Sequence, residues 1–432
     1  MARNWFEQLL RPMRKEGELA VPPGLYHAMQ GSEGQYTRFH LRVERDGQGM
    51  LTANAHAAAR LSPTGVLIVK GLLDGQTEPQ ILAQLKRRFR GASEATMSSD
   101  IAGVHALIEQ LGSPGDSYPV FNLEDAAISP YDTALIAPLQ ASLPAGNPEA
   151  VLPLLSRLWG VGIPHVTLLA QEGFVAADAV RAVERAEDLG MIAGIRGRAS
   201  DLKRGTFMAD IAQAGIDHVG FIYAATRPGI HDALCGEGDH AAAHELMSWL
   251  EEQQICAVAE VPLVQATLNE LDDTLTALLA MGADNVAFVA LATTDRELSQ
   301  TDGVFYADAM PQVAAIVEEA AHEVNARFIW DPPVQRDPRK SLSEQVREGP
   351  RCSGDVAVRI ELDGSVIPPR GPYSAAGNLL RDSWDSIWNH EVFRVYRERV
   401  EAPTRCGTCP GLAICAADCP REPRGWALTD QA

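Results

Sequence analysis

The 432-residue sequence has no apolar run that approaches the roughly 18 residues needed to span a membrane. It also lacks the phosphate-binding signatures G-x4-G-K-[ST] and G-x-G-x2-G and the G-x-S-x-G turn of serine hydrolases. The first stretch, MARNWFEQLLRPMRKEGELAV, contains neither the apolar core of a secretory signal nor a small-residue cleavage site. We therefore expect a cytoplasmic protein without a membrane partner.

Positive charge is also scarce. The chain has 37 Lys and Arg against 57 Asp and Glu, which gives a formal net charge of −20. Such acidity opposes binding to nucleic acid, whose phosphates must be neutralised by basic residues. Because 432 residues exceed one typical hydrophobic core, we expect several domains.

The seven cysteines are few, but five of them fall in the last part of the chain. The stretch RCGTCPGLAICAADCP places Cys406, Cys409, Cys415 and Cys419 in the spacing C-x2-C-x5-C-x3-C. In a reducing compartment disulfides are disfavoured, so clustered thiols indicate a metal or iron–sulfur site. The 11 histidines are scattered, and we expect no histidine-based metal site.

The first third of the chain predicts a small domain after a short extension. Residues 1–37 are expected to form a helix and a Pro/Gly-containing linker, and residues 38–115 a winged-helix-like unit. A hairpin is predicted around Asp46-Gly47. Helices are predicted from the N-terminal signals at Ser62 and Thr77, each followed closely by proline, and a third helix in SSDIAGVHALIEQL.

Residues 116–345 alternate between strand-like and helix-like segments. The short β-branched runs HVTLLAQ, MIAGIRG, HVGFIYAA, ICAVAEVPLV and NVAFVAL are separated by amphipathic helical patterns that often end in glycine. About six such β-α units predict an α/β fold with a parallel sheet, as a partial barrel of the (β/α)6 type rather than a complete eightfold barrel. Residues 346–432 are cysteine-rich and loop-rich, as expected of a segment that a metal holds together.

The C-terminal segment resembles the SPASM domain of radical S-adenosylmethionine (radical SAM) peptide-modifying enzymes. The matching residues are Cys352, the turn LDGSVIPP, the stretch GNLLRDSWDSIWNHEVFRVYR and the four clustered cysteines. The central region resembles the radical SAM partial barrel, and residues 38–115 resemble the PqqD-like domain that recognises precursor peptides. That resemblance implies that the leader of a ribosomally made peptide adds as a strand to the hairpin edge.

The sequence departs from this family at the residues that carry its chemistry. The family holds its catalytic iron–sulfur cluster with C-x3-C-x2-C after the first barrel strand, and this spacing does not occur here. Alignment by eye places Asp132, Ile136 and Leu139 at the three cysteine positions. The family's GGEP motif, which contacts S-adenosylmethionine, corresponds to Ala170-Gln171-Glu172-Gly173. The resemblance therefore implies a pseudo-enzyme that does not bind S-adenosylmethionine productively, and no catalytic or cofactor-binding residue is nominated.

The remaining cysteines predict a metal site whose occupant is open. The family's second cysteine is replaced by Pro369, and no cysteine follows the last of the four. The resemblance implies one auxiliary 4Fe–4S cluster on Cys406, Cys409 and Cys415, with Asp418, Asp430, Cys419 by rearrangement or an outside ligand as the fourth ligand. A structural zinc site with four thiolates is the alternative. The metal-ligand candidates are Cys352, Cys406, Cys409, Cys415 and Cys419.

Two functions follow as expectations. The first is a non-catalytic subunit that binds a precursor peptide through residues 38–115 and presents it to an intact radical SAM or other maturation enzyme. The second is an enzyme with repurposed barrel chemistry, or an electron-transfer subunit that uses the residual cluster.

Overall fold

The computed structural model describes most of the chain between residues 19 and 393, together with residue 413. The description leaves out residues 33–34, 55–56, 90, 113–134, 284, 294, 296, 298, 300–302, 327, 333, 335–338, 350–356 and 368–374. The chain divides into two compact units, and each is described by itself. No helix in the described part combines the length and the apolar character that crossing a membrane requires.

Unit 1 is an antiparallel four-stranded sheet with three helices. Its strands pair in the order β1-β2-β3-β4. In chain order the elements are β1 (Gly24–Ser32), β2 (Gln35–Val43), β3 (Gly49–Ala53), β4 (Ala57–Leu61), α1 (Pro63–Leu73), α2 (Glu78–Arg88) and α3 (Glu94–Gly112).

The hairpin predicted around Asp46-Gly47 is present as β2 and β3, but it is not a sheet edge. We expected a linker before residue 38, whereas residues 24–32 form β1 and pair with β2 along their whole length. On the other side, β4 pairs with all five residues of β3. Both hairpin strands are therefore flanked, and the outer edges of the sheet are β1 and β4.

The helices of unit 1 begin where the sequence predicted. The Ser62 hydroxyl accepts a hydrogen bond from Gly65 N at 3.2 Å, which caps α1. The side chain of Gln80 reaches back to accept from Thr77 N at 2.8 Å at the start of α2. The alternate residues Phe39, Leu41 and Val43 of β2 are at most 1% exposed and belong to the core that the helices cover.

The other side of β2, with the residue that follows the strand, carries buried polar groups. Arg42 and Glu44 are 1% and 2% exposed, and Arg42 Nε lies 2.6 Å from Glu44 Oε1. The second carboxylate oxygen of Glu44 accepts from Ile136 N at 2.6 Å. Burial of two charges is tolerated because each has a partner, so this pair fixes the segment at residue 136 onto the end of β2.

Unit 2 is built on a ten-stranded sheet in the order β13-β10-β9-β8-β7-β6-β5-β14-β15-β16. Its strands are β5 (Gln140–Pro144), β6 (His165–Leu169), β7 (Ile192–Gly197), β8 (His218–Ile222), β9 (Cys256–Leu263), β10 (Val286–Ala290), β13 (Phe328–Asp331), β14 (Ala357–Ile360), β15 (Ser365–Ile367) and β16 (Gly377–Asn378), with the short pair β11 (Ala292–Thr293) and β12 (Phe305–Tyr306) outside the sheet. Its helices are α4 (Pro148–Val161), α5 (Ala176–Leu189), α6 (Ala199–Leu202), α7 (Phe207–Gln213), α8 (Pro228–Cys235), α9 (Asp239–Glu252), α10 (Gln265–Leu268), α11 (Leu271–Ala280), η3 (Ala307–Ala309), α13 (Met310–Glu323), α14 (Leu342–Glu348) and α15 (Trp384–Trp388).

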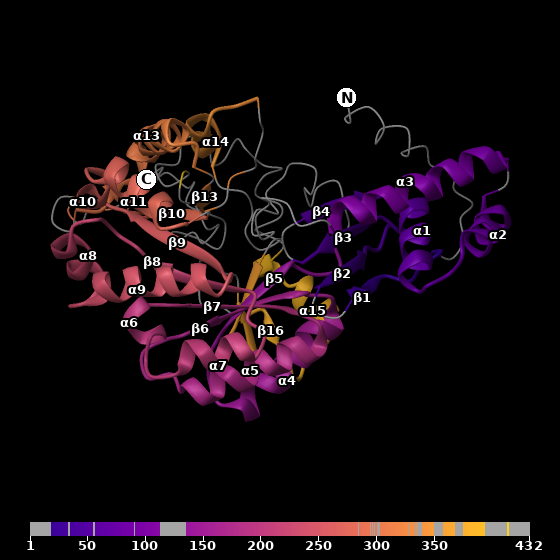
Figure 1. Cartoon of the computed structure of the whole chain (residues 1–432), viewed down its shortest axis with the longest axis horizontal. Helices are drawn as coiled ribbons and strands as arrows, with labels where there is room; N and C mark the ends of the chain where they lie inside the picture. Colours follow the sequence, from indigo (N-terminus) through magenta and orange to yellow (C-terminus); the bar gives the residue numbers. More distant parts are fainter. Residues whose placement is uncertain are drawn as a thin grey trace, which may run out of the picture. The chain divides into compact units, whose positions relative to one another are not determined.

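The strand order explains why the connecting helices cover one face of this sheet. From β5 through β10 to β13 the strands follow one another in one direction and pair in parallel. Right-handed crossovers then place every connecting helix on the same face, and α4, α5 and α7 lie side by side along β6 and β7 (Figure 1). The residues facing the helices are fully buried: Leu143, Val166, Leu168, Ile195, Val219, Phe221, Ala259, Val261, Val286 and Phe288.

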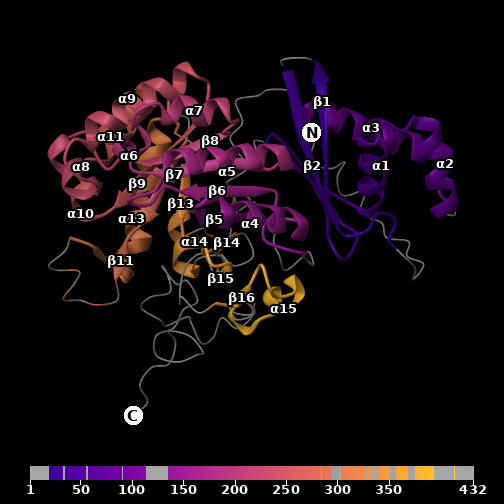
Figure 2. The ribbon, with the colours of Figure 1, turned by 90° about the horizontal axis from the view of Figure 1, so that it is seen from below.

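The last described segment extends the same sheet. Strand β14 pairs in parallel with β5, and β15 and β16 follow it antiparallel, as Figure 2 shows beside β5. The turn LDGS and the dipeptide GN meet here, because the Asn378 amide donates to Asp363 O at 2.7 Å. Gly364 leaves room for this contact, since a Cβ atom there would lie 2.8 Å from Asn378 Oδ1. Within the described residues the sheet is open, with β13 and β16 as its outer strands.

Candidate functional site

The predicted metal cysteines lie outside the described residues. This holds for Cys352, Cys406, Cys409, Cys415 and Cys419, and for the ligand-position residues Asp132, Pro369, Asp418 and Asp430. The cysteine site therefore stays a prediction. The two remaining cysteines, which we assigned no function, are Cys235 at the end of α8 and Cys256 at the start of β9.

The structure does not support the alignment that placed Ile136 and Leu139 in a loop after the first strand. Ile136 and Leu139 are buried residues that precede β5, the first parallel strand, whereas the family's loop follows the first strand. The connection after β5 consists only of residues 145–147, because α4 begins at Pro148. These three residues are Ala-Gly-Asn and contain no thiol. The alignment failed because QASLP contains no β-branched residue and gave no strand signal.

The segment Ala170–Gly173 has the position that the alignment predicted. It follows β6, the second parallel strand, and precedes α5. Gly173 has φ +79°, which is accessible to glycine but strained for other residues. Glu172 is exposed and therefore gives no sign of a built site.

The face of the sheet opposite the helices carries a charge cluster towards the carboxyl ends of the strands. Arg196 near the end of β7 forms an ion pair with Glu260 of β9, with Nη2–Oε2 at 2.5 Å. The strand between them contributes Gly220, where a Cβ would make ordinary contacts of 3.5 Å with both side chains, so the pair bridges over β8. The Glu260 side chain is 11% exposed, whereas that of Arg196 is 48% exposed.

This cluster can bind a charged group but offers no acid–base pair. The Glu260 carboxylate, and further away Asp331 at the end of β13, raise the pKa of Arg196, so the guanidinium stays charged. Ligands of parallel α/β sheets lie at the carboxyl ends of the strands, where these residues are. An exposed guanidinium can hold a carboxylate in bidentate geometry.

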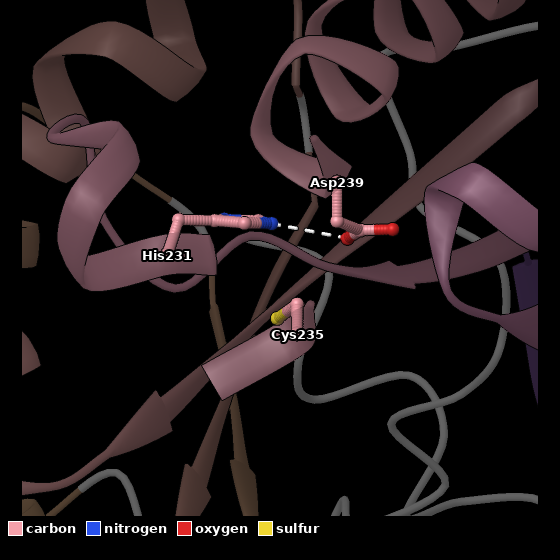
Figure 3. Close-up of side chains that lie close together, drawn as sticks. All are labelled: His231, Cys235 and Asp239. Atoms are coloured by element: carbon pink, nitrogen blue, oxygen red, sulfur yellow. Dashed lines mark hydrogen bonds and ion pairs between the residues drawn. The ribbon is translucent and has the colours of Figure 1, made fainter. Parts of the chain in front are cut away.

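A second polar cluster lies where α8 and α9 meet, beside the end of β8. His231, Cys235 and Asp239 are all buried, and their potential ligand atoms lie within 4.8 Å of one another. Figure 3 shows the His231 ring and the Asp239 carboxylate facing each other, with the Cys235 thiol off this line. His231 Nε2 and Asp239 Oδ2 are 3.0 Å apart.

The hydrogen bonds show that His231 has no free lone pair for a metal. Its Nδ1 accepts from Ala224 N at 3.1 Å, so the proton is on Nε2, which donates to Asp239. Burial would raise the pKa of Asp239, but hydrogen bonds from His231 and Ser200 outweigh it and lower the pKa. Because neither ring nitrogen faces the thiol, this group is not a nucleophilic triad either.

The Cys235 thiol is expected to be unreactive in this environment. Burial, with nearby Asp239 and Asp232, raises the pKa of its thiol to about 12, so the thiolate that attacks or ligates is nearly absent. The cluster of His231, Cys235 and Asp239 instead connects α6, which follows β7, to α8 and α9. The link to α6 is the hydrogen bond that Ser200 N donates to Asp239 Oδ1 at 2.8 Å. We interpret the cluster as the support of this corner of unit 2.

The sequence reading missed two histidines beside this support. His240 and His244 have the spacing H-x3-H on α9, which a systematic search for histidines four residues apart would have found. Their ring centroids are 4.6 Å apart. The hydroxyl of Tyr223, the residue after β8, lies 2.9 Å from His244 Nε2. Burial, and after it the neighbouring histidine rings, lower the pKa of both histidines.

Comparison with solved structures identifies proteins of similar fold. SuiB of Streptococcus suis bound to S-adenosylmethionine matches with a TM-score of 0.58 and 11% identity, over 91% of this chain and 95% of that one. SuiB bound to the precursor peptide SuiA matches with a TM-score of 0.57 and 11% identity, over 94% and 99%. No family model and no curated protein sequence matches the chain. The chain thus shares the mixed α/β fold of SuiB along nearly its whole length.

Proposed function

We propose that this chain is a non-catalytic, peptide-binding subunit of a ribosomal-peptide maturation system. The observation that carries the proposal is the connection of only three residues between β5 and α4, in a chain with the fold of SuiB. A C-x3-C-x2-C motif spans eight residues and cannot fit there. The retained parts would bind and present a precursor peptide, while an intact partner enzyme supplies the radical chemistry.

The loss of catalysis has a direct test. The purified chain is reconstituted with iron and sulfide, reduced, and supplied with S-adenosylmethionine. We expect no 5′-deoxyadenosine above the level of a no-protein control. Formation of 5′-deoxyadenosine by several turnovers per chain would refute a non-catalytic role. An intact radical SAM enzyme treated in parallel shows that the reductant and the cluster reconstitution work.

For the leader peptide we propose the edge of β1 as the docking site. Strand addition needs an unpaired edge, and β2 and β3 are each paired on both sides. Of the two outer strands, β1 has nine residues and β4 has five, so β1 offers the longer row of backbone groups. Met29 of β1 is 52% exposed and gives an arriving strand an apolar neighbour.

A fluorescence anisotropy titration with a labelled precursor peptide tests this site. The probe is a synthetic copy of a short precursor-like peptide chosen from the genes that neighbour the chain's own gene. Met29→Ala should weaken binding about two- to fivefold, the range of one cross-strand side-chain pair. Leu234→Ala on α8 is the matched control, because Leu234 is also an exposed apolar residue, at 49%, but lies in unit 2. Equal affinity of both variants and wild type would exclude β1, and no binding of wild type at tens of micromolar would exclude the function.

The cysteine-rich tail is proposed to hold one metal centre. Three thiolates from Cys406, Cys409 and Cys415 match the family's ligands for an auxiliary 4Fe–4S cluster, and four thiolates would suit zinc equally well. Anaerobic purification followed by metal analysis separates the two. A brown protein with iron and sulfide supports the cluster, whereas a colourless protein with one zinc per chain supports the alternative.

An enzyme with repurposed chemistry is the second candidate, and the Arg196–Glu260 pair is the observation that favours it. A half-exposed guanidinium at the carboxyl ends of the strands suits a substrate carboxylate. If this face turns over a substrate, Arg196→Met should abolish turnover and leave the anisotropy titration unchanged. If this face of the sheet only holds the peptide, Arg196→Met should weaken peptide binding in the anisotropy titration.

A further inference from the structure

The two histidines of α9 that the sequence reading missed form a compact group with Tyr223. His240 and His244 are one helical turn apart, so both rings project from the same side of α9. Their ring centroids lie 5.9 Å and 5.5 Å from that of Tyr223. Tyr223 is fully buried and follows β8, so the group lies at the carboxyl end of this strand.

One ring nitrogen of His240 is buried and has no hydrogen-bond partner among the described residues. This atom is Nε2. The backbone carbonyl of Thr226 acts to raise the pKa of His240, and since Nε2 has no partner we assign this contact, and the ring proton, to Nδ1. A donated Nδ1–H leaves a lone pair on Nε2, and this is the arrangement that metal-binding histidines use to fix their orientation. A buried nitrogen without a partner is otherwise costly.

His244 presents its Nε2 to the same group. The Tyr223 hydroxyl lies 2.9 Å from this nitrogen. A phenol is a stronger acid than a neutral imidazole, so the hydroxyl donates and His244 Nε2 accepts. Both histidines therefore have an Nε2 lone pair, and both rings neighbour Tyr223. Burial raises the pKa of Tyr223 to about 12, so its oxygen can ligate a metal only if the ion displaces the phenolic proton.

We propose that His240 Nε2, His244 Nε2 and Tyr223 Oη bind a divalent transition-metal ion of the zinc class. Metal–nitrogen bonds of about 2.0–2.1 Å place the centres of two imidazoles on one ion roughly 5 Å apart, and the measured separation is 4.6 Å. The phenolic proton leaves to water when the oxygen ligates. Three protein ligands leave a fourth position for water or a small ligand, as in open zinc sites.

The surrounding structure holds these ligands in place. The carboxylate of Asp232 accepts from Gly238 N at 3.0 Å and from His240 N at 2.9 Å, which fixes the start of α9. The buried His231–Asp239 hydrogen bond ties α8 to the same point. The three ligands belong to the segment 223–244 and include none of the predicted cysteine ligands.

Equilibrium dialysis against Co²⁺ tests the proposal on the full chain. At the Co²⁺ concentrations used, wild type should bind one Co²⁺ ion more per chain than either His240→Gln or His244→Gln. Each substitution should weaken Co²⁺ binding at the site by at least about a hundredfold, which exceeds the effect expected from loss of a supporting residue. Tyr223→Phe should remove the phenolate-to-metal absorption seen when Cu²⁺ replaces Co²⁺. Thiolate-to-cobalt absorption should be the same in all proteins, which shows that the cysteine tail is intact.

Glu245→Gln is the matched control, since Glu245 adjoins His244 and its side chain is 68% exposed. It should retain the additional Co²⁺. Equal stoichiometry and affinity in wild type and both histidine variants would overturn the proposal. Circular dichroism at the growth temperature confirms that each variant is folded. A variant that fails this check is replaced by His240→Asn or His244→Asn, so that the comparison is still made.

Discussion

A buried pair of histidines should make unit 2 sensitive to acid. His165 begins β6 and His218 begins β8, and they are 4% and 3% exposed. Their rings pack edge to face with centroids 5.0 Å apart. Burial lowers the pKa of His165 from 6.5 to about 4. Burial, and after it the neighbouring His165, lower the pKa of His218 well below its ordinary value.

The sign and size of the effect follow from proton linkage. A histidine with a depressed pKa in the folded state takes up protons more readily when the chain unfolds. The histidine therefore does not change the free energy of unfolding above pH 6.5, and the folded state loses stability as the pH falls from 6.5 towards 4. For His165 alone, this loss is about 2 kcal/mol at pH 5 and about 3 kcal/mol below pH 4.

Urea unfolding at pH 7 and pH 5 measures this loss. Tryptophan fluorescence follows unit 2, which contains Trp159, Trp249 and Trp330. Wild type should lose about 2 kcal/mol more than His165→Gln between the two pH values. Thr167→Val, on the same side of β6, has no titrating group and should behave as wild type. An equal loss in wild type and His165→Gln would refute the reasoning.

Three further changes have definite expected outcomes. Glu44→Ala leaves the buried Arg42 without this partner and should cost about 3–5 kcal/mol in urea unfolding of unit 1, followed by circular dichroism; a loss below about 1 kcal/mol would contradict a buried pair. Gly194→Ala should prevent stable folding of unit 2 or lower its melting temperature strongly, because the new Cβ would lie 1.6 Å from His218 Nε2; a variant that melts like wild type would show that the ring moves freely. Cys235 should react with iodoacetamide about a thousandfold more slowly than an ordinary thiol, as expected for a pKa of about 12; rapid labelling in a peptide map would contradict its burial.

The elements that carry their own local signal were predictable from the sequence. Five apolar runs between residues 165 and 291 became β6 to β10, nearly residue for residue. The helix before Gly190 ends there as expected, since this glycine has φ +80° and caps α5. The stretch TLNELDDTLTALLAMG, read as one helix, is divided into α10 and α11, because Asn269 and Glu270 separate them.

Elements that depend on pairing were missed. Residues 24–32, GLYHAMQGS, contain two glycines and no β-branched residue, and they form a strand because β2 offers a partner for each of them. The same holds for QASLP at 140–144, which lies between β6 and β14. The Arg196–Glu260 ion pair could not be predicted from the sequence either, because its residues are 64 positions apart and the pairing of the strands brings them together.

The three-residue connection after β5 also determines what protein engineering could introduce at this strand end. Replacing residues 145–147 with cysteines would place three thiols side by side, without the spacing that lets them point at one cluster. Point substitutions therefore cannot build a C-x3-C-x2-C site after this strand. Such a site would require a grafted loop of at least eight residues between Pro144 and Pro148, beside the fully buried Leu143 and Val151. The length of the connection, rather than the identity of any one of its residues, is what a design would have to change.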